Sequence, residues 1–192
     1  VTAYHEAGHA IVARHREGND PVEKVTIVPR GRAMGVTYMV PERDRYGHSR
    51  QQLTAKIAMA FGGRVAEQLT FGDEHVTSGA QQDIKMATAI ARRMVTQYGM
   101  SERVGMVDHS EDDGEVFLGE QLVRSKSISE ATAREIDNEV KALVDEGYHE
   151  AKRILTDRSR ELEHLASALM AFETLDAKGI EGVIEASKEG TA

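Results

Sequence analysis

The first residues of the chain include side chains that could bind a metal ion and cut a bond. His5, Glu6 and His9 form the pattern His-Glu-x-x-His within the segment AYHEAGHAIVARH. The apolar residues of this segment have helical spacing over residues 2–16, which places His5 and His9 on one face with Cβ atoms about 5–6 Å apart. Both imidazoles can then reach one zinc ion at about 2.0–2.1 Å.

Glu6 supplies the group that such a site needs for hydrolysis. A zinc ion lowers the pKa of a bound water from about 15.7 to about 7. Glu6 can take a proton from this zinc-bound water and pass it to the leaving amine. Two unrelated histidines beside a surface glutamate are the plainer interpretation. We favour the zinc site because the pattern lies on an otherwise apolar helix.

A catalytic zinc site needs a third protein ligand and an open fourth position. His15 stands where some zinc proteases have a third histidine, but that pattern also requires glycine at position 12, and this chain has Val12. Without the glycine the helix continues and carries His15 away from the metal. We therefore expect His15 not to be a ligand.

Two carboxylates on later predicted helices are candidates for the third ligand. Glu67 lies in GGRVAEQL and Asp83 lies in TSGAQQDIKMAT, each after glycines that allow close packing. Asp83 falls in the first turn of its helix, where the helix dipole favours a negative charge. Glu67 also suits an ordinary exposed helix position. Residue types and spacing leave the choice open.

The composition is that of a soluble globular protein. Of the 192 residues, 40% are hydrophobic and 29% are charged, and the net charge of -8 argues against a nucleic-acid partner. No apolar run approaches the roughly 18 residues that a membrane span needs. Cysteine is absent, so a metal must be held by His, Asp or Glu. Aromatic residues make up only 5%, which leaves the core to aliphatic side chains and favours helices.

The elements that must position the site are mainly helical. After the first helix, VEKVTIVPR and MGVTYMV are rich in β-branched residues and predict a small antiparallel sheet near the N-terminus. The glycine pair at 62–63 lies inside a predicted helix and indicates close approach of another backbone. Helices are predicted at 50–69, at 80–98, after a capping box SISE at 127–130, at 157–172, and from Thr174 to Ile184.

These elements predict a mainly α zinc-metallopeptidase domain over residues 1–192, with a small N-terminal sheet and a C-terminal helical hairpin. Residues 1–124 would form the catalytic part and residues 125–187 the C-terminal helices packed on it. Residues 188–192 would be a frayed tail. We assign no function to the acidic loop around 109–118.

Four segments together resemble the protease domain of the FtsH family of membrane-anchored, ATP-dependent zinc metalloproteases. They are YHEAGHAIVA, GGRVAEQLTFG, TSGAQQDIKMATAIARRMVTQYGMSE and SISEATAREIDNEVKALVDEGYHEAKRIL, and they cover nearly all of the chain in the family's order. The resemblance implies that His5 and His9 bind zinc and that Glu6 is the catalytic glutamate. It also implies that Asp83 is the third zinc ligand, whereas Glu67 stands close to the site in a second-shell position.

The same resemblance implies an ATP-dependent zinc metalloendopeptidase of protein quality control, with one Zn²⁺ per chain. Its substrates would be unfolded or membrane proteins, delivered by an ATPase ring, and its assembly a homo-hexamer. ATP and Mg²⁺ would belong to the ATPase module. The chain begins at Val1, just before the zinc motif, and has no GxxxxGK[ST] phosphate loop. We therefore interpret it as a soluble fragment from which the ATPase and transmembrane regions are absent.

In the full-length protein the resemblance implies a membrane anchor, with the protease domain in the bacterial cytoplasm or at an organelle membrane in a eukaryote. We also expect the strand GVTYMV to lie beside the cleft and to bind an extended substrate by strand addition.

Two other functions stay open on the residues alone. One is an oligomerisation module built on the long helices at 128–172, with a structural metal held by four ligands. The other is a metallohydrolase acting on a non-peptide bond, for which the sequence offers no phosphate or sugar pocket. The remaining histidines are expected to be surface or cap residues. They are His48, His75, His109, His149 and His164.

Overall fold

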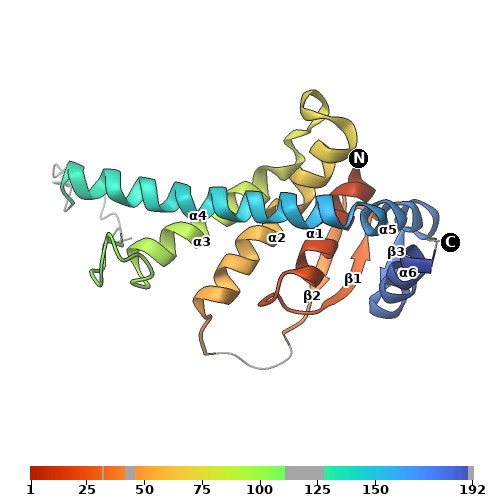
Figure 1. The fold of residues 1–192 in the computed structure, drawn as a ribbon, viewed down its shortest axis with the longest axis horizontal. Coiled ribbons are helices and arrows are strands. Elements are labelled where there is room, and N and C mark those ends of the chain that lie inside the picture. The colour runs from red at the N-terminus through yellow and green to blue at the C-terminus, as the bar shows by residue number, and fades with distance from the viewer. Residues whose placement is uncertain (32, 42–45, 111–127, 190–192) are drawn as a thin grey trace.

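The computed structural model describes residues 1–31, 33–41, 46–110 and 128–189. Helices make up most of it (Figure 1), so the prediction of a mainly α fold with a small sheet is confirmed. The helices are α1 Thr2–His15, α2 Arg50–Phe71, η1 Asp73–His75, η2 Ser78–Ala80, α3 Gln81–Thr96, α4 Glu130–Asp157, α5 Ser159–Phe172 and α6 Ala177–Glu189, where η marks a 3₁₀ helix.

The sheet has three antiparallel strands in the order β2-β1-β3. Strands β1 (Val22–Thr26) and β2 (Val36–Met39) are the predicted pair. Strand β3 (Thr174–Asp176) was not predicted, and the expectation that Thr174 caps the last helix was wrong. The Thr174 hydroxyl instead bonds to the Thr26 hydroxyl at 2.7 Å, and α6 begins at residue 177. The C-terminal part of the chain thus completes the N-terminal sheet.

Helices α1 and α2 cross at their glycines. A Cβ atom placed on Gly62 would lie 2.5 Å from the carbonyl oxygen of Gly8, and one placed on Gly8 would collide with the carbonyl of Gly62. A Cβ atom on Gly63 would collide with the His5 imidazole. The prediction that the paired glycines permit close backbone approach is therefore confirmed, and this approach sets α2 directly against the part of α1 that carries His5 and His9.

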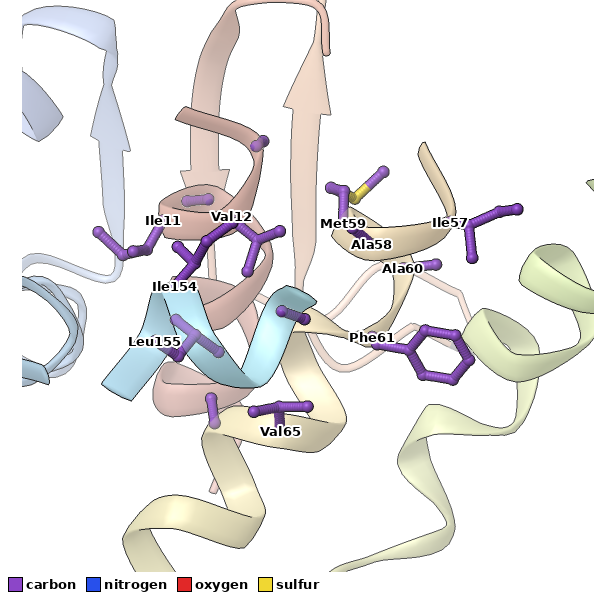
Figure 2. Close-up of a cluster of buried hydrophobic side chains, with 14 of the residues drawn as sticks. Ile11, Val12, Ile57, Ala58, Met59, Ala60, Phe61, Val65, Ile154 and Leu155 are labelled. Atoms are coloured by element: carbon purple, nitrogen blue, oxygen red, sulfur yellow. The ribbon is translucent and has the colours of Figure 1, made fainter. Parts of the chain in front are cut away.

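The core lies between α1, α2 and α4. Figure 2 shows side chains of these three helices meeting in one buried cluster. Helix α4 packs mainly on α2, while α5 packs mainly on α1 and α6. Helices α4 and α5 thus cover α2 and α1, the two helices that cross at Gly62 and Gly8. The labelled members of the cluster are Ile11, Val12, Ile57, Ala58, Met59, Ala60, Phe61, Val65, Ile154 and Leu155.

Some predicted boundaries differ from those of the structure. Helix α4 is capped by Ser129, whose hydroxyl accepts a hydrogen bond from the Thr132 N–H at 3.2 Å, and Ser127 of the predicted capping box lies outside the described residues. Most of the acidic 109–118 loop also lies outside them. The predicted tail is helical as far as Glu189. None of the described helices combines the length and the apolar character that a membrane crossing requires.

Candidate metal centre

Three ligand atoms of His5, His9 and Asp83 surround one point. His5 Nε2 lies 3.1 Å from His9 Nε2 and 3.2 Å from Asp83 Oδ2, and His9 Nε2 lies 3.5 Å from the same oxygen. A tetrahedral zinc ion with bonds of about 2.0–2.1 Å separates its ligand atoms by about 3.3 Å. The three separations match three edges of such a tetrahedron. Within the described ranges, no other group of His, Asp or Glu is close enough to hold a metal ion.

The Nδ1 atoms of both histidines are engaged behind this point. His9 Nδ1 donates to the carbonyl oxygen of Met59 at 2.8 Å, and His5 Nδ1 lies 2.7 Å from Glu67 Oε1. A carbonyl only accepts, so the hydrogen of a neutral His9 sits on Nδ1 and its Nε2 presents a lone pair. The same holds for a neutral His5 beside an ionised Glu67. Two lone pairs then face a carboxylate oxygen, an arrangement that a cation stabilises and that fits zinc.

Asp83 reaches this point through the turn that precedes α3. The Thr77 hydroxyl accepts a hydrogen bond from the Gly79 N–H at 3.2 Å and so starts η2, from which α3 continues with Asp83 in its first turn. Burial alone would raise the pKa of Asp83. The hydrogen bonds and charges of His5 and His9 outweigh burial and hold this pKa far below its usual range.

Glu67 lies behind His5 rather than at the point where the ligand atoms meet. Its side chain is almost fully buried, and its carboxylate accepts hydrogen bonds from His5 and from the Thr77 backbone N–H at 2.8 Å. Burial favours the neutral acid, but these hydrogen bonds outweigh it and lower the pKa of Glu67. The geometry therefore favours a supporting role over a ligand role.

The protonation of His5 responds to the same carboxylates. Burial lowers its pKa, but the hydrogen bonds to Asp83 and Glu67, together with the charges of Asp83 and Glu6, outweigh burial and raise the pKa above the ordinary histidine value. A protonated His5 can donate from Nε2 to Asp83 Oδ2, which lies 3.2 Å away.

Glu6 follows His5 on α1, and the residue is 7% exposed. Burial raises the pKa of Glu6, against the opposing charges of His9 and His5 and a hydrogen bond from the Thr37 hydroxyl. Thr37 belongs to β2, so the sheet and α1 meet at this carboxylate. A buried carboxylate with a raised pKa beside a metal site suits proton transfer.

The remaining histidines lie apart from the three-residue group. Helix α1 continues through Val12, as expected, and His15 Nε2 pairs with Glu161 Oε2 of α5 at 2.6 Å. His149 and His164 each donate to the carbonyl one turn earlier in their own helices. His75 ends the exposed turn η1.

Sequence reasoning missed the residues that hold these side chains in place. Thr37 has the pattern of any half-buried strand residue, and the Met59 carbonyl is a backbone group with no sequence signal. Thr77 gives a weak signal, since a threonine just before a helical segment is typical of a cap. Thr37 and the Met59 carbonyl act through contacts between segments that are distant in the sequence, whereas Thr77 contacts Glu67 ten residues earlier.

The model of Peptidase family M41 matches residues 1–183 of the chain. Three similar proteins, from Caulobacter vibrioides, Photobacterium profundum and Rubrobacter xylanophilus, are each named "ATP-dependent zinc metalloprotease FtsH". They are 51%, 48% and 48% identical to it over 96%, 98% and 96% of its length. The chain spans only 30%, 27% and 28% of the lengths of these relatives.

Proposed function

Because this chain belongs to peptidase family M41 and is similar to the FtsH zinc metalloproteases, we propose that it is their zinc-dependent endopeptidase domain. The observation that supports this most strongly is the meeting of His5, His9 and Asp83 ligand atoms at tetrahedral spacing. The buried Glu6 stands beside them as the catalytic carboxylate.

His5, His9 and Asp83 would hold a single zinc ion, with Glu67 orienting His5 from behind. Among the described residues no fourth His, Asp or Glu joins the group, which suits an open catalytic position better than a closed structural site. A bound zinc ion would polarise the scissile carbonyl and lower the pKa of a water ligand to about 7.

Glu6 performs the proton transfers in this proposal. Its carboxylate accepts a proton from the attacking water and then delivers it to the nitrogen of the leaving amine. Burial raises its pKa towards the operating pH, and a pKa near that pH serves a group that must both accept and release a proton.

Substrate would bind along β2. In the sheet order β2-β1-β3, β2 is an edge strand, so an extended peptide could pair with it by strand addition. The side chain of Thr37 on β2 bonds to Glu6, so a peptide paired there would lie beside the catalytic carboxylate. Only an unfolded segment can present its backbone in this way, and this selects unfolded protein substrates.

The similar proteins also suggest which other modules act with this domain and how it assembles. Their name includes ATP dependence, and this chain spans less than a third of their length. We propose that an ATPase module with bound ATP and Mg²⁺ delivers substrates, that the assembly is a homo-hexamer, and that a membrane anchor lies in another part of the protein. Residues 1–124 would form the catalytic part of this domain and residues 125–187 its helical support.

Metal removal and replacement test the proposed activity. The zinc-loaded protein should cleave unfolded casein, lose this activity when a chelator removes the zinc, and regain it when zinc is added back. Cleavage that continues in demonstrably zinc-free protein would contradict the proposal.

A further inference from the structure

Strand β2 and the residue just before it, Gly35, both contact Glu6. The Thr37 hydroxyl lies 3.0 Å from Glu6 Oε2 and 3.2 Å from the Glu6 carbonyl oxygen, and it donates to this pair of acceptors. Gly35 packs against the rest of the side chain, because a Cβ atom placed on it would lie 2.7 Å from Glu6 Cγ and 2.8 Å from Glu6 Oε1. Gly35 immediately precedes β2, and Thr37 is the second residue of this strand, so both contacts come from the start of β2.

These contacts leave Glu6 little freedom. Within the described part of the chain, Thr37 is the one hydrogen-bond donor to the Glu6 carboxylate. The residue is 7% exposed, so water has little room to replace this donor. A glutamate side chain has several rotatable bonds, and fixing it in one rotamer requires contacts of this kind.

We propose that Thr37 is a positioning residue for the general base and that Gly35 provides the space in which Glu6 sits. This inference rests on the proposed role of Glu6. The hydroxyl holds Oε2, and no described residue donates a hydrogen bond to Oε1, so Oε1 can accept the proton from water. A displacement of a catalytic group by about 1 Å can cost on the order of 100-fold in rate.

In this proposal β2 both binds the substrate backbone and positions the Glu6 carboxylate. Thr37 on β2 and Gly35 just before it hold Glu6, whereas the outer edge of β2 is where we place the substrate backbone. A peptide that pairs with β2 therefore aligns itself on the element that fixes the base. This arrangement ties the position of the scissile bond to the position of Glu6.

The test uses the zinc-loaded full-length protease and an unfolded protein substrate. Thr37→Val keeps the shape and the β-branching of threonine but removes the donor, so kcat should fall by about 10- to 100-fold. KM should stay within about twofold and the zinc content should be unchanged, since neither the strand edge nor the ligands are altered. Thr37→Ser, which restores a hydroxyl, should recover most of the lost kcat.

A second variant tests the role of Gly35, and a third serves as a control for removing a threonine hydroxyl. Gly35→Ala should also lower kcat with zinc retained, because its new methyl group displaces the Glu6 carboxylate. Thr156→Val is the matched control, since among the described residues the Thr156 hydroxyl bonds to the carbonyl of Lys152 within α4, and it should leave kcat unchanged.

A Thr37→Val variant that keeps the parental kcat would overturn the inference, and so would one that loses zinc or shows only a raised KM. If Thr37→Val behaves like the parent while Glu6→Gln is inactive, only the role of Thr37 fails. If Glu6→Gln itself cleaves at the parental rate, the proposed function fails with it.

Discussion

Glu67 Oε1 lies 2.7 Å from His5 Nδ1, on the side of the imidazole away from the ligand atom Nε2. Helix α1 also carries a second, partly buried histidine–glutamate pair, His15 Nε2 with Glu161 Oε2 at 2.6 Å, and among the described residues this pair belongs to no group that could hold a metal. Comparing the two pairs distinguishes the effect of a carboxylate on zinc binding from the effect of a histidine–glutamate contact on stability.

Glu67→Gln should weaken zinc binding by about 10- to 100-fold, as is typical when the carboxylate behind a ligating histidine is changed. A competitive titration with a zinc-binding dye measures this. Glu161→Gln is the matched control and should leave the zinc affinity as it is in the parent. Equal losses in both variants would show that Glu67 acts through stability alone.

Asp83→Asn should weaken zinc binding more than Glu67→Gln does, because it removes the charged ligand itself and not a group behind a ligand. The same titration gives the order of the two effects. If Asp83→Asn kept its zinc and Glu67→Gln lost it, the third ligand would be Glu67, the alternative that the residue pattern leaves open.

Zinc binding to the metal-free protein should release protons. The pKa of His5 is raised in the folded metal-free protein, so the imidazole still holds a proton at a pH above its ordinary pKa, and zinc must displace it. Apparent zinc affinity should therefore rise with pH up to the raised pKa of His5 and level off above it. Calorimetry in two buffers of different ionisation enthalpy counts the protons; a heat that is independent of buffer would contradict this.

The raised pKa of His5 also makes the stability of the metal-free protein depend on pH. Stability should fall as the pH rises, whereas zinc affinity should increase. A group whose pKa is raised on folding contributes stability that is fully present below its unfolded pKa and is lost as the pH rises through its folded pKa. The free energy of unfolding of the metal-free protein should thus lose the His5 contribution in the window just above the ordinary histidine pKa. His5→Gln should remove this pH dependence.

The glycine crossing of α1 and α2 should tolerate no side chain. Gly62→Ala places a methyl group against the Gly8 backbone, and we expect the free energy of unfolding to fall by about 1–3 kcal/mol. Gly182→Ala is the control, because nothing lies within 4 Å of a Cβ atom at that helix position and alanine favours helix there by roughly 0.5–1 kcal/mol. Urea unfolding compares the two; a stabilised Gly62→Ala would show that the helices can separate freely.

The sequence could predict those features that depend on local pattern. Helical spacing located α1 and α2, and β-branched runs located β1 and β2. The strand β3 was not predicted because its three residues are too few to show the alternation of a strand. It forms by pairing with β1. The predicted start of α4 differs from the observed one because the sequence allows either Ser127 or Ser129 as the cap. The hydrogen bond from the Thr132 N–H identifies Ser129 as the cap.

The candidate site also combines residues that a local motif predicts with residues that only the tertiary fold brings together. His5, Glu6 and His9 follow from a local motif on a helix, and the structure brings Asp83 to them from a segment far along the chain. Spacing could not choose between Glu67 and Asp83, because that choice depends on how α2 and α3 meet α1. Thr37 and the Met59 carbonyl carry no signal of their own, since their role arises only where β2 and α2 touch the motif helix.

Glu6→Gln tests the proposed chemistry most directly. Glutamine keeps the size of the side chain and accepts the Thr37 hydrogen bond, but it cannot take a proton from water. The purified variant should retain the zinc content of the parent and should cleave unfolded casein at least about 100-fold more slowly, the range expected for loss of a general base. Cleavage at the parental rate with zinc retained would contradict the role of Glu6, and with it the proposed mechanism.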